Sequence, residues 1–233
     1  MEGESIIKGN GMIGTAIRGV QNQLIQPWLV IAAGVSDSKN LNPADYQREL
    51  LLVERCLKES QHKNLPILYI SSYSVKDETM IMSPYVRNKL RIERIIIDAS
   101  SENRILRITN AVGHRGNPSN VINYLVHAVV SGSSFNVWRN TRRNFVDVEH
   151  IAQFVKSLDT NSDPVIELVH PQTYSLPSIL ETIERLFNIS ANYTIVDSKP
   201  NHYECNECSD SFFQGINEGD QLYLTRLLSK YYG

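Results

Sequence analysis

Cysteine, net charge and long apolar runs are all scarce in this sequence. Three cysteines among 233 residues are too few and too unevenly spaced for a disulfide framework, which predicts a reducing compartment, the cytoplasm. The longest uninterrupted apolar run, residues 28–33, is far short of the ~18 to 20 residues that a membrane-spanning helix needs. The acidic N-terminus lacks the basic and apolar regions of a secretory signal. A net charge of -2 gives no reason to expect nucleic acid or an anionic membrane as a partner.

One pair of cysteines, Cys205 and Cys208, has the CxxC spacing of metal and redox sites. A structural zinc site needs about four ligands, and no second CxxC or HxxxH pair accompanies this one. A thioredoxin-type motif opens a helix after an early strand, whereas this pair lies near the C-terminus. We therefore interpret the spacing as coincidence and expect no metal site.

Strand and helix patterns alternate from the beginning of the chain, which predicts an α/β fold with a parallel sheet. Apolar runs predict strands at residues 5–8, 28–33, 66–70, 104–109, 135–138, 144–148 and 165–169. Periodic apolar stripes predict helices at residues 12–23, 43–59, 84–99, 120–130, 149–158 and 178–187. The stretches 193–196 and 222–232 are the hardest to interpret.

Between the first expected strand and helix lies a GxGxxG sequence, composed of Gly9, Asn10, Gly11, Met12, Ile13 and Gly14. Two such glycines allow a tight turn and close approach to a pyrophosphate, and the third allows helix and strand to pack closely. The helix N-terminus then offers unpaired N–H groups to the phosphates. Alone the motif is weak, but its position in the first strand–turn–helix unit favours dinucleotide binding over a simple glycine-rich turn.

A tyrosine and a lysine four residues apart, Tyr85 and Lys89, share one face at the start of an expected helix. A neighbouring ammonium favours the phenolate form of a phenol, as general acid–base catalysis at neutral pH requires. Ser72 ends the preceding strand, where its hydroxyl could bond the same substrate oxygen. A bare YxxxK is common by chance and is usually a solvated pair. The glycine loop, the serine and the Tyr–Lys helix in this order together favour hydride-transfer chemistry.

These residues resemble the extended short-chain dehydrogenases/reductases, in particular the NAD-dependent epimerase/dehydratase family that acts on sugar nucleotides. The similar segments are the glycine loop, Ile31–Gly34, Tyr69–Val75, Tyr85 with Lys89, Leu106–Gly113 and Arg143–Val148. The resemblance implies a Rossmann-like parallel sheet flanked by helices with a small C-terminal substrate-binding portion. It also implies one domain over 1–233, in which 1–113 is mainly the dinucleotide-binding core and 114–233 mixes core and substrate-binding elements.

The resemblance further implies the roles of the site residues. Tyr85 would be the general acid/base, Lys89 its cationic and ribose-binding partner, and Ser72 the group that polarises the substrate oxygen. NAD or NADP would contact the six residues of the glycine loop and also Ala32, Ala33, Gly34, Ser71, Tyr85, Lys89 and Ile108. The nucleotide-sugar substrate would contact Ser72, Tyr73, Asn110, Asn120 and Arg143.

The chain departs from the family pattern between its first two expected strands. Gly14 is followed by one helix and then directly by residues 28–33, so the usual second and third strands are missing and the first becomes an edge. An acid on the usual second strand reads the adenosine ribose. A competing alignment makes 28–33 that second strand and Asp37 the acid, but Asp37 lies beyond the strand end. Asp45 stands where the family often has asparagine. The choice between NAD and NADP therefore stays open.

Several functions fit this pattern. The favoured one is a sugar-nucleotide ketoreductase of polysaccharide or glycoconjugate biosynthesis, and the alternative is a sugar-nucleotide epimerase. A dehydratase would need a carboxylate pair after the catalytic serine, which Ser72-Tyr73-Ser74 does not supply. A non-catalytic dinucleotide-binding sensor is the alternative of another class, although such relatives usually lose the tyrosine or the lysine. Family members often dimerise through the helices expected at 43–59 and 84–99, so the resemblance implies a homodimer that the sequence leaves open.

Overall fold

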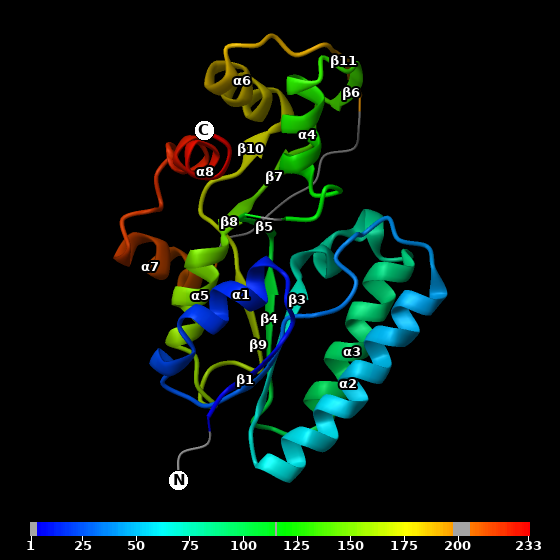
Figure 1. Cartoon of the computed structure of the whole chain (residues 1–233), viewed down its shortest axis with the longest axis vertical. Helices are drawn as coiled ribbons and strands as arrows, with labels where there is room; N and C mark the ends of the chain where they lie inside the picture. The colour runs from blue at the N-terminus through cyan, green and yellow to red at the C-terminus, as the bar shows by residue number, and fades with distance from the viewer. Residues whose placement is uncertain (1–3, 115, 198–205) are drawn as a thin grey trace. The chain divides into compact units, whose positions relative to one another are not determined.

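The computed structural model describes residues 4–114, 116–197 and 206–233. Their contacts divide the chain into two compact units (Figure 1). Unit 1 comprises Met1–Thr109 and Val148–Leu168, and unit 2 comprises Asn110–Asp147 and Val169–Gly233. The chain thus leaves unit 1 after residue 109 and returns to it at residue 148. The expectation of one domain with a division at residue 113 stays a prediction.

Unit 1 is built around a five-stranded parallel sheet. Its strands lie in the order β1 (Ile6–Lys8), β2 (Leu29–Ile31), β3 (Ile67–Ser72), β4 (Arg104–Ile108) and β9 (Val165–Leu168). The register brings Ile7 beside Val30, Val30 beside Leu68 and Leu68 beside Arg104. β2 and the first five residues of β3 are buried, as expected of strands covered on both faces.

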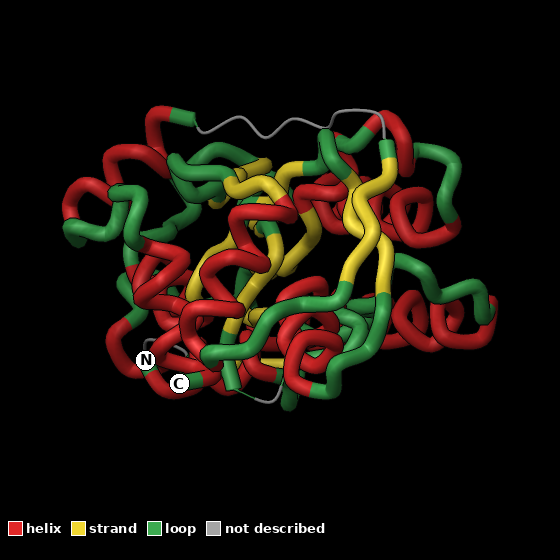
Figure 2. Tube along the Cα trace, turned by 90° about the horizontal axis from the view of Figure 1, so that it is seen from above, coloured by secondary structure: helices red, strands yellow, loops and turns green. Residues whose placement is uncertain are grey.

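Helices cover both faces of this sheet. α1 (Met12–Gly19) packs against α5 (Val148–Lys156), and α2 (Pro43–Lys63) packs against α3 (Pro84–Ala99). The two pairs lie on opposite sides of the strands (Figures 1 and 2). Short 3-10 helices follow α1 at Gln21–Gln23 and β3 at Tyr73–Lys76 and Glu78–Met80. The predicted α/β fold, a Rossmann-like parallel sheet between helices, is confirmed.

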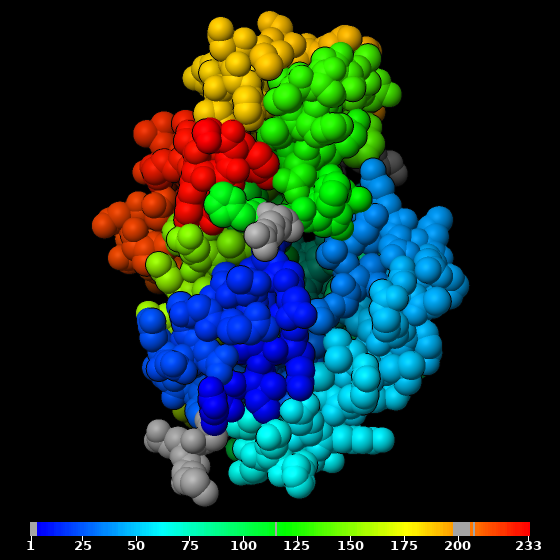
Figure 3. Space-filling view, viewed as in Figure 1, coloured from blue at the N-terminus to red at the C-terminus, as the bar shows by residue number. Residues whose placement is uncertain are grey.

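Local sequence explains where the two long helices begin. Asn42 accepts a hydrogen bond from the Ala44 backbone N–H at 3.1 Å, and Pro43 occupies the first helical position of α2. Ser83 caps α3 in the same way, because its Oγ accepts from the Val86 N–H at 3.2 Å ahead of Pro84. α2 ends at Asn64, whose φ of 50° is the left-handed conformation of a helix C-cap. The outer face of α2 lies at the surface (Figure 3).

The strand order bears out the predicted departure from the usual sheet. In the classic order of a dinucleotide-binding sheet the first strand is central. Here β1 pairs with β2, and no other described strand pairs with it, so β1 forms an edge. β2 in turn lies between β1 and β3, which is where the strand after the missing pair belongs.

Unit 2 combines helices with three two-stranded pairs. β5 (Asn110–Val112) pairs in parallel with β8 (Phe145–Asp147), and β6 (Phe135–Trp138) pairs in parallel with β11 (Tyr193–Val196). β7 (Arg142–Arg143) pairs antiparallel with β10 (Tyr174–Ser175). The helices are α4 (Val121–Val130), α6 (Leu176–Phe187), α7 (Glu207–Gly215) and α8 (Tyr223–Tyr232), and α6 packs against both α4 and α8.

Buried aromatic and charged contacts attach the C-terminal helix of unit 2. The buried His170 ring stacks on Tyr223 with 3.9 Å between centroids. The buried carboxylate of Asp147 accepts from Lys230 Nζ at 2.8 Å and from the Tyr231 hydroxyl at 2.6 Å. None of the described helices combines the length and apolarity that crossing a bilayer would require.

Candidate active site

The glycine loop lies between β1 and α1, at the carboxyl end of the first strand. Gly9 has a φ of +140°, and a Cβ there would lie 2.2 Å from the Ala32 carbonyl oxygen of the neighbouring loop. A Cβ on Gly14 would lie 2.4 Å from the Gly9 oxygen, so both positions require glycine for packing. Gly11 differs, because a Cβ there would meet nothing within 4 Å. Its surroundings are open to an approaching ligand.

The N-terminus of α1 has the properties of a phosphate site. Gly11 is its N-cap residue and supplies no side chain, so no side-chain hydrogen bond caps the first turn. The unpaired N–H groups and the positive end of the helix dipole favour an anion there. Asn10 and Gly11 are exposed, while Met12 and Ile13 are half-buried behind them. The open position and the free amides fit a dinucleotide pyrophosphate.

Two cations beside this loop, Arg18 and Lys8, already have partners. Arg18 donates to the Gly9 carbonyl oxygen at 2.9 Å, which supports the loop from the last turn of α1. Lys8 forms an ion pair with Glu59 at 2.8 Å.

Parallel strands place the other expected cofactor contacts along the same carboxyl edge of the sheet. Ala32, Ala33 and Gly34 follow β2, Ser71 and Ser72 end β3, and Ile108 ends β4 beside Ser72 in the register. Ala32 and Ala33 are half-buried and Gly34 is exposed, whereas Ile108 is buried with 6% exposure. The structure therefore brings the predicted residues of unit 1 to one edge.

The catalytic pair predicted from the sequence lies at the start of α3. Tyr85 is 6% exposed and packs in an apolar cluster with Val35 and Val86. The Lys89 Nζ lies 5.6 Å from the centroid of the Tyr85 ring. Among the described residues, no hydrogen bond joins the Tyr85 hydroxyl to a partner, and this oxygen is not among the buried polar atoms without one. The ring is thus packed while its oxygen reaches the surface.

Ser72 lies half-buried at the end of β3. Its Oγ accepts a hydrogen bond from the Ser74 N–H at 3.2 Å and so caps the 3-10 helix Tyr73–Lys76. Val75 of that helix packs against the cluster that contains Tyr85. Because Ser72 accepts in this contact, its own O–H proton can be donated to a substrate oxygen. Tyr73 is buried, with 5% exposure.

Ser71 has a structural partner. Its Oγ donates to Glu93 Oε1 at 2.5 Å, and Glu93 also binds Arg107 at 2.7 Å. Arg107 in turn forms an ion pair with Glu167 of β9 at 3.2 Å. This network joins α3, β4 and β9 beneath the carboxyl edge. Burial opposes the charge of Arg107, but its hydrogen bonds to Glu93 and Glu167 outweigh that effect and raise the pKa of the guanidinium.

The sequence reasoning missed Glu49, a carboxylate on the buried face of α2. Lys89 Nζ donates to Glu49 Oε1 at 2.7 Å and to the Tyr69 oxygen at 2.9 Å. Both Lys89 and Glu49 are buried, with 5% and 2% exposure. Burial opposes the charge of Lys89, yet the oxygens of Tyr69, Tyr85 and Glu49 outweigh it and raise the pKa of its ammonium. Lys89 is therefore protonated at every physiological pH and paired.

A signal for Glu49 was present in the sequence. Glu49, Val53 and Cys56 follow the i, i+4, i+7 spacing of one helix face, and all three are buried. On α3, Lys89 lies on the buried stripe with Val86 and Ile92. An acid and a base on the buried stripes of consecutive helices indicate an ion pair. The charged residue at a buried helix position is thus visible in the sequence, while its contacts with Tyr69 and Lys89 are visible only in the fold.

The expected substrate residues of unit 2 have local partners. The Asn110 side-chain amide donates to the Asn144 carbonyl oxygen at 2.8 Å. Asn120 caps α4 by accepting from the Ile122 N–H at 3.2 Å and donates to the Ala111 oxygen at 2.9 Å. Arg143 is half-buried in β7, and its guanidinium donates to the Arg142 carbonyl oxygen at 3.1 Å. Their roles toward a substrate stay predictions.

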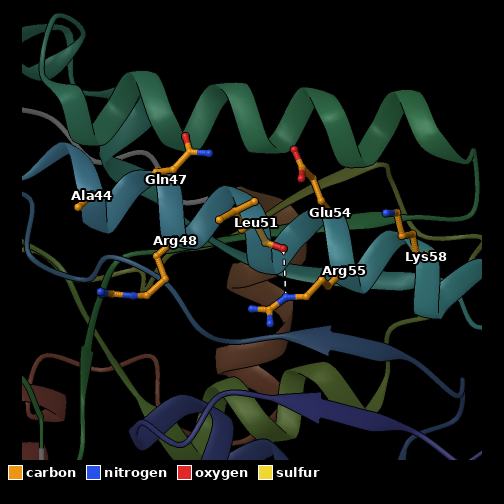
Figure 4. A pocket seen from close by; sticks show the side chains of 7 residues that line it. All are labelled: Ala44, Gln47, Arg48, Leu51, Glu54, Arg55 and Lys58. Atoms are coloured by element: carbon orange, nitrogen blue, oxygen red, sulfur yellow. Dashed lines mark hydrogen bonds between the residues drawn. The ribbon is translucent and has the colours of Figure 1, made fainter.

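Two other features lie outside this site. A shallow hollow on the outer face of α2 is lined by Ala44, Gln47, Arg48, Leu51, Glu54, Arg55 and Lys58 (Figure 4). These side chains lie on the opposite face of the helix from Glu49, so the hollow is separate from the buried cluster. Of the CxxC pair, Cys205 lies outside the described residues. Within the described part of the chain, no group of three or more His, Cys, Asp or Glu residues could hold a metal ion.

Comparison with known proteins places this geometry in context. The sequence profile of the NAD dependent epimerase/dehydratase family matches residues 15–165, more than half of the chain. The match begins directly after the glycine loop. The interpretation of that loop as a phosphate site therefore depends on its geometry and not on the family match. No curated protein matches the chain.

Solved structures of the same fold are similar over nearly the whole chain. UDP-glucuronic acid 4-epimerase from Bacillus cereus, in complex with UDP-glucuronic acid and NAD, has 18% identity and a TM-score of 0.67, covering 93% of this chain and 76% of that chain. RMD from Pseudomonas aeruginosa, complexed with NADPH, has 15% identity and a TM-score of 0.70, covering 94% and 93%. UDP-glucose 4-epimerase from Thermus thermophilus, in complex with NAD, has 15% identity and a TM-score of 0.64, covering 96% and 84%. Identities this low show a shared fold.

Proposed function

The chain belongs to the NAD-dependent epimerase/dehydratase family, and we propose that it is an NAD(P)-dependent oxidoreductase acting on a nucleotide-activated sugar. The favoured activity is that of a ketoreductase. The observation that carries this proposal is the Tyr85–Lys89 pair at the carboxyl edge of the sheet. The similar structures from Bacillus cereus and Thermus thermophilus hold NAD, and the one from Pseudomonas aeruginosa holds NADPH, which supports a nicotinamide cofactor here.

The residues of unit 1 would divide the work of binding and proton transfer. The free N–H groups after Gly11 would hold the pyrophosphate, and Lys89 would bind the nicotinamide ribose. Ser72 would donate its hydroxyl proton to the substrate oxygen and so orient it. The Tyr85 hydroxyl would give its proton to that oxygen as the carbonyl is reduced, or take it back in oxidation. A bound nicotinamide supplies the hydride that a sugar carbon accepts.

An epimerase would use the same residues, and the edge position of β1 is the observation that favours the reductase. A net reductase must release spent cofactor in each turnover, whereas an epimerase retains it. Among the described strands, none occupies the place beside β1 where the usual second strand carries the acid for the adenosine ribose. A cofactor site with fewer adenosine contacts suits release. The non-catalytic alternative is less favoured because both Tyr85 and Lys89 are present.

The test is a reductase assay with a matched tyrosine control. Wild type, Tyr85→Phe and Tyr124→Phe are incubated with NADPH or NADH and a panel of nucleotide-linked keto-sugars, and the loss of nicotinamide absorbance is followed. Losing the general acid should lower the rate of Tyr85→Phe by at least ~100-fold. Tyr124 lies half-exposed in α4, and its variant should keep the wild-type rate. A rate unchanged in Tyr85→Phe would remove the role assigned to this phenol.

A second assay distinguishes the alternatives. If no keto-sugar is reduced but a nucleotide sugar is converted to its epimer with bound NAD, the enzyme is an epimerase. If dinucleotide binds with no turnover on either panel, the chain is a sensor.

A further inference from the structure

Glu49 is a buried carboxylate beside the proposed catalytic pair. Its side chain lies on the inner face of α2, on the buried stripe with Leu50 and Val53, and the residue is 2% exposed. A buried carboxylate is costly unless hydrogen bonds and an opposite charge compensate it.

Both carboxylate oxygens of Glu49 are filled by donors. Oε1 accepts from Lys89 Nζ at 2.7 Å and from the Tyr69 hydroxyl at 3.0 Å. Oε2 accepts from the Asn88 side-chain amide at 3.0 Å and from the Val35 N–H at 3.2 Å. The donors come from β3, from α3 and from the loop after β2. One carboxylate therefore joins three segments of the carboxyl edge.

The same carboxylate packs against the loop that follows β2. Gly34 has a φ of +135°, and a Cβ at that position would lie 2.1 Å from Glu49 Oε1. Gly34 thus leaves the space that the carboxylate occupies, and the Val35 N–H holds it there. This arrangement fixes the side chain, and Lys89 is fixed with it.

We infer that Glu49 is a positioning residue that holds the Lys89 ammonium and cancels its charge beside Tyr85. The inference rests on the proposed function, in which Tyr85 transfers the proton. It means that this phenol works next to an ion pair, whereas the sequence alone predicts a free cation beside it.

The charge of the whole cluster gives the sign of the effect. With Glu49 ionised, Lys89 protonated and Tyr85 neutral, the cluster carries no net charge, and losing a proton makes it negative. In Glu49→Gln the same cluster begins with one positive charge, and losing a proton makes it neutral. A buried site favours the neutral state, so the first proton leaves at lower pH in the variant. The sign holds whether that proton comes from the phenol or from the ammonium.

The other titratable groups around the pair do not reverse this argument. Tyr69 of β3 donates to Glu49, and burial raises the pKa of its hydroxyl, so it stays neutral. Tyr46 of α2 packs against the Tyr85 cluster and donates to the Asn40 carbonyl oxygen at 2.5 Å. Burial, together with the charges near it, raises the pKa of Tyr46 as well. Asp37 is close enough for its charge to act on Tyr46. It is present in both wild type and Glu49→Gln, so its effect is the same in the two proteins that are compared.

The direct test needs no substrate. Tyrosinate absorbance is titrated in wild type, Tyr85→Phe, Glu49→Gln and the double variant, because subtracting each Tyr85→Phe curve isolates one of the eleven tyrosines. The difference curve shows one absorbance step, at the pH where Tyr85 ionises, which we call the Tyr85 step. We expect this step about one pH unit lower in Glu49→Gln than with Glu49 present, the scale of one nearby charge. Glu102→Gln, an exposed turn residue of the same unit, should leave the step unchanged. A Tyr85 step at the same pH in Glu49→Gln and wild type would overturn the inference.

A second pair of variants keeps the test decisive if Glu49→Gln does not fold. Replacing both members of a buried ion pair is often tolerated, so Glu49→Gln/Lys89→Gln is compared with Lys89→Gln alone. The Tyr85 step should again be lower where the carboxylate is absent. Equal steps in these two proteins would overturn the inference.

The activity assay then separates this inference from the proposed function. In the reductase assay, the limb of the pH–rate profile that depends on Tyr85 should move to lower pH by the same amount in Glu49→Gln. If no sugar nucleotide is turned over while the tyrosinate step still shifts, the charge coupling stands and the proposed function fails. If turnover occurs and neither the limb nor the step moves, the proposed function stands and Glu49 has no such role.

Discussion

The three glycines of the N-terminal loop have different tasks. Gly14 is buried, and a Cβ there would collide with the Gly9 backbone at 2.4 Å, so its glycine serves packing. Gly11 is exposed, has an ordinary φ of -75° and would accept a Cβ with no neighbour within 4 Å. Nothing in the fold requires glycine at residue 11. We propose that glycine there serves the approach of a phosphate to the helix N-terminus.

Alanine substitutions should separate these tasks. Gly14→Ala should destabilise the protein by about 1–3 kcal/mol, as overpacking against backbone does. Gly11→Ala should leave the unfolding free energy within about 0.5 kcal/mol of wild type but weaken NADH binding at least tenfold, because the methyl group occupies the pyrophosphate approach. Chemical denaturation and NADH fluorescence titration measure the two effects. Unaltered NADH affinity in Gly11→Ala would contradict a phosphate site at this turn.

At single positions the sequence was informative where backbone geometry decides the residue. The glycine spacing predicted a turn between a strand and a helix, and Gly9 and Gly14 do make close backbone approaches there. Glu49 was missed because its importance comes from contacts with residues 69 and 89, which only the folded chain brings near. Sequence spacing within one helix predicts a shared face, but it does not name the partner across the next helix.

At the scale of elements, long periodic segments were predicted well. α3 was expected at residues 84–99 and spans Pro84–Ala99, because a Ser–Pro start and a regular apolar stripe define it. The helix expected at 43–59 continues to Lys63, where Asn64 ends it. β5, β7 and β10 were not predicted. They have two or three residues each, too few for periodicity, and they exist through pairing with strands distant in the sequence.

One buried side chain connects the end of α3 to the start of β3. Asn103 is 2% exposed, accepts from the Ile67 N–H at 2.8 Å and donates to the Ile96 carbonyl oxygen at 2.8 Å. Asn103→Ala leaves both backbone groups buried without this partner, so we expect a loss of about 2–3 kcal/mol in the unfolding free energy. Urea denaturation measures it. Ser101→Ala, exposed two residues earlier, is the control, and equal stability of both variants would refute the connection.

At the scale of the molecule, the two units follow from how the chain is connected. Residues 110–147 leave unit 1 after β4, and α5 and β9 return to complete its sheet and helix layer. The sequence predicted the parallel sheet, because strand and helix patterns alternate along the chain, and the described strands bear out the edge position of β1. It did not predict the split of unit 1 into two segments, because no linker composition marks the crossings at residues 109 and 148. Contacts between distant segments define those boundaries.

The outer faces of α2 and α3 in unit 1 leave apolar side chains at the surface. Leu51 is 47% exposed among the charged residues of α2 (Figure 4). Leu90 of α3 is 37% exposed. We propose that a second copy of the chain covers this surface, as expected from the family resemblance. Such a twofold pairing buries the same leucines from both copies. The apolar surface that is removed from water favours association.

Charge placed on this surface should then separate the copies. Light scattering after size exclusion should give wild type a mass about twice that of the 26.5 kDa chain. Leu51→Glu/Leu90→Glu should run as a folded monomer, because burying two carboxylates per copy costs more than the contact provides. Leu222→Glu, at a leucine that is 64% exposed in unit 2, should remain dimeric. A monomeric wild type at micromolar concentration, or a dimeric double variant, would show that these helices do not form the interface.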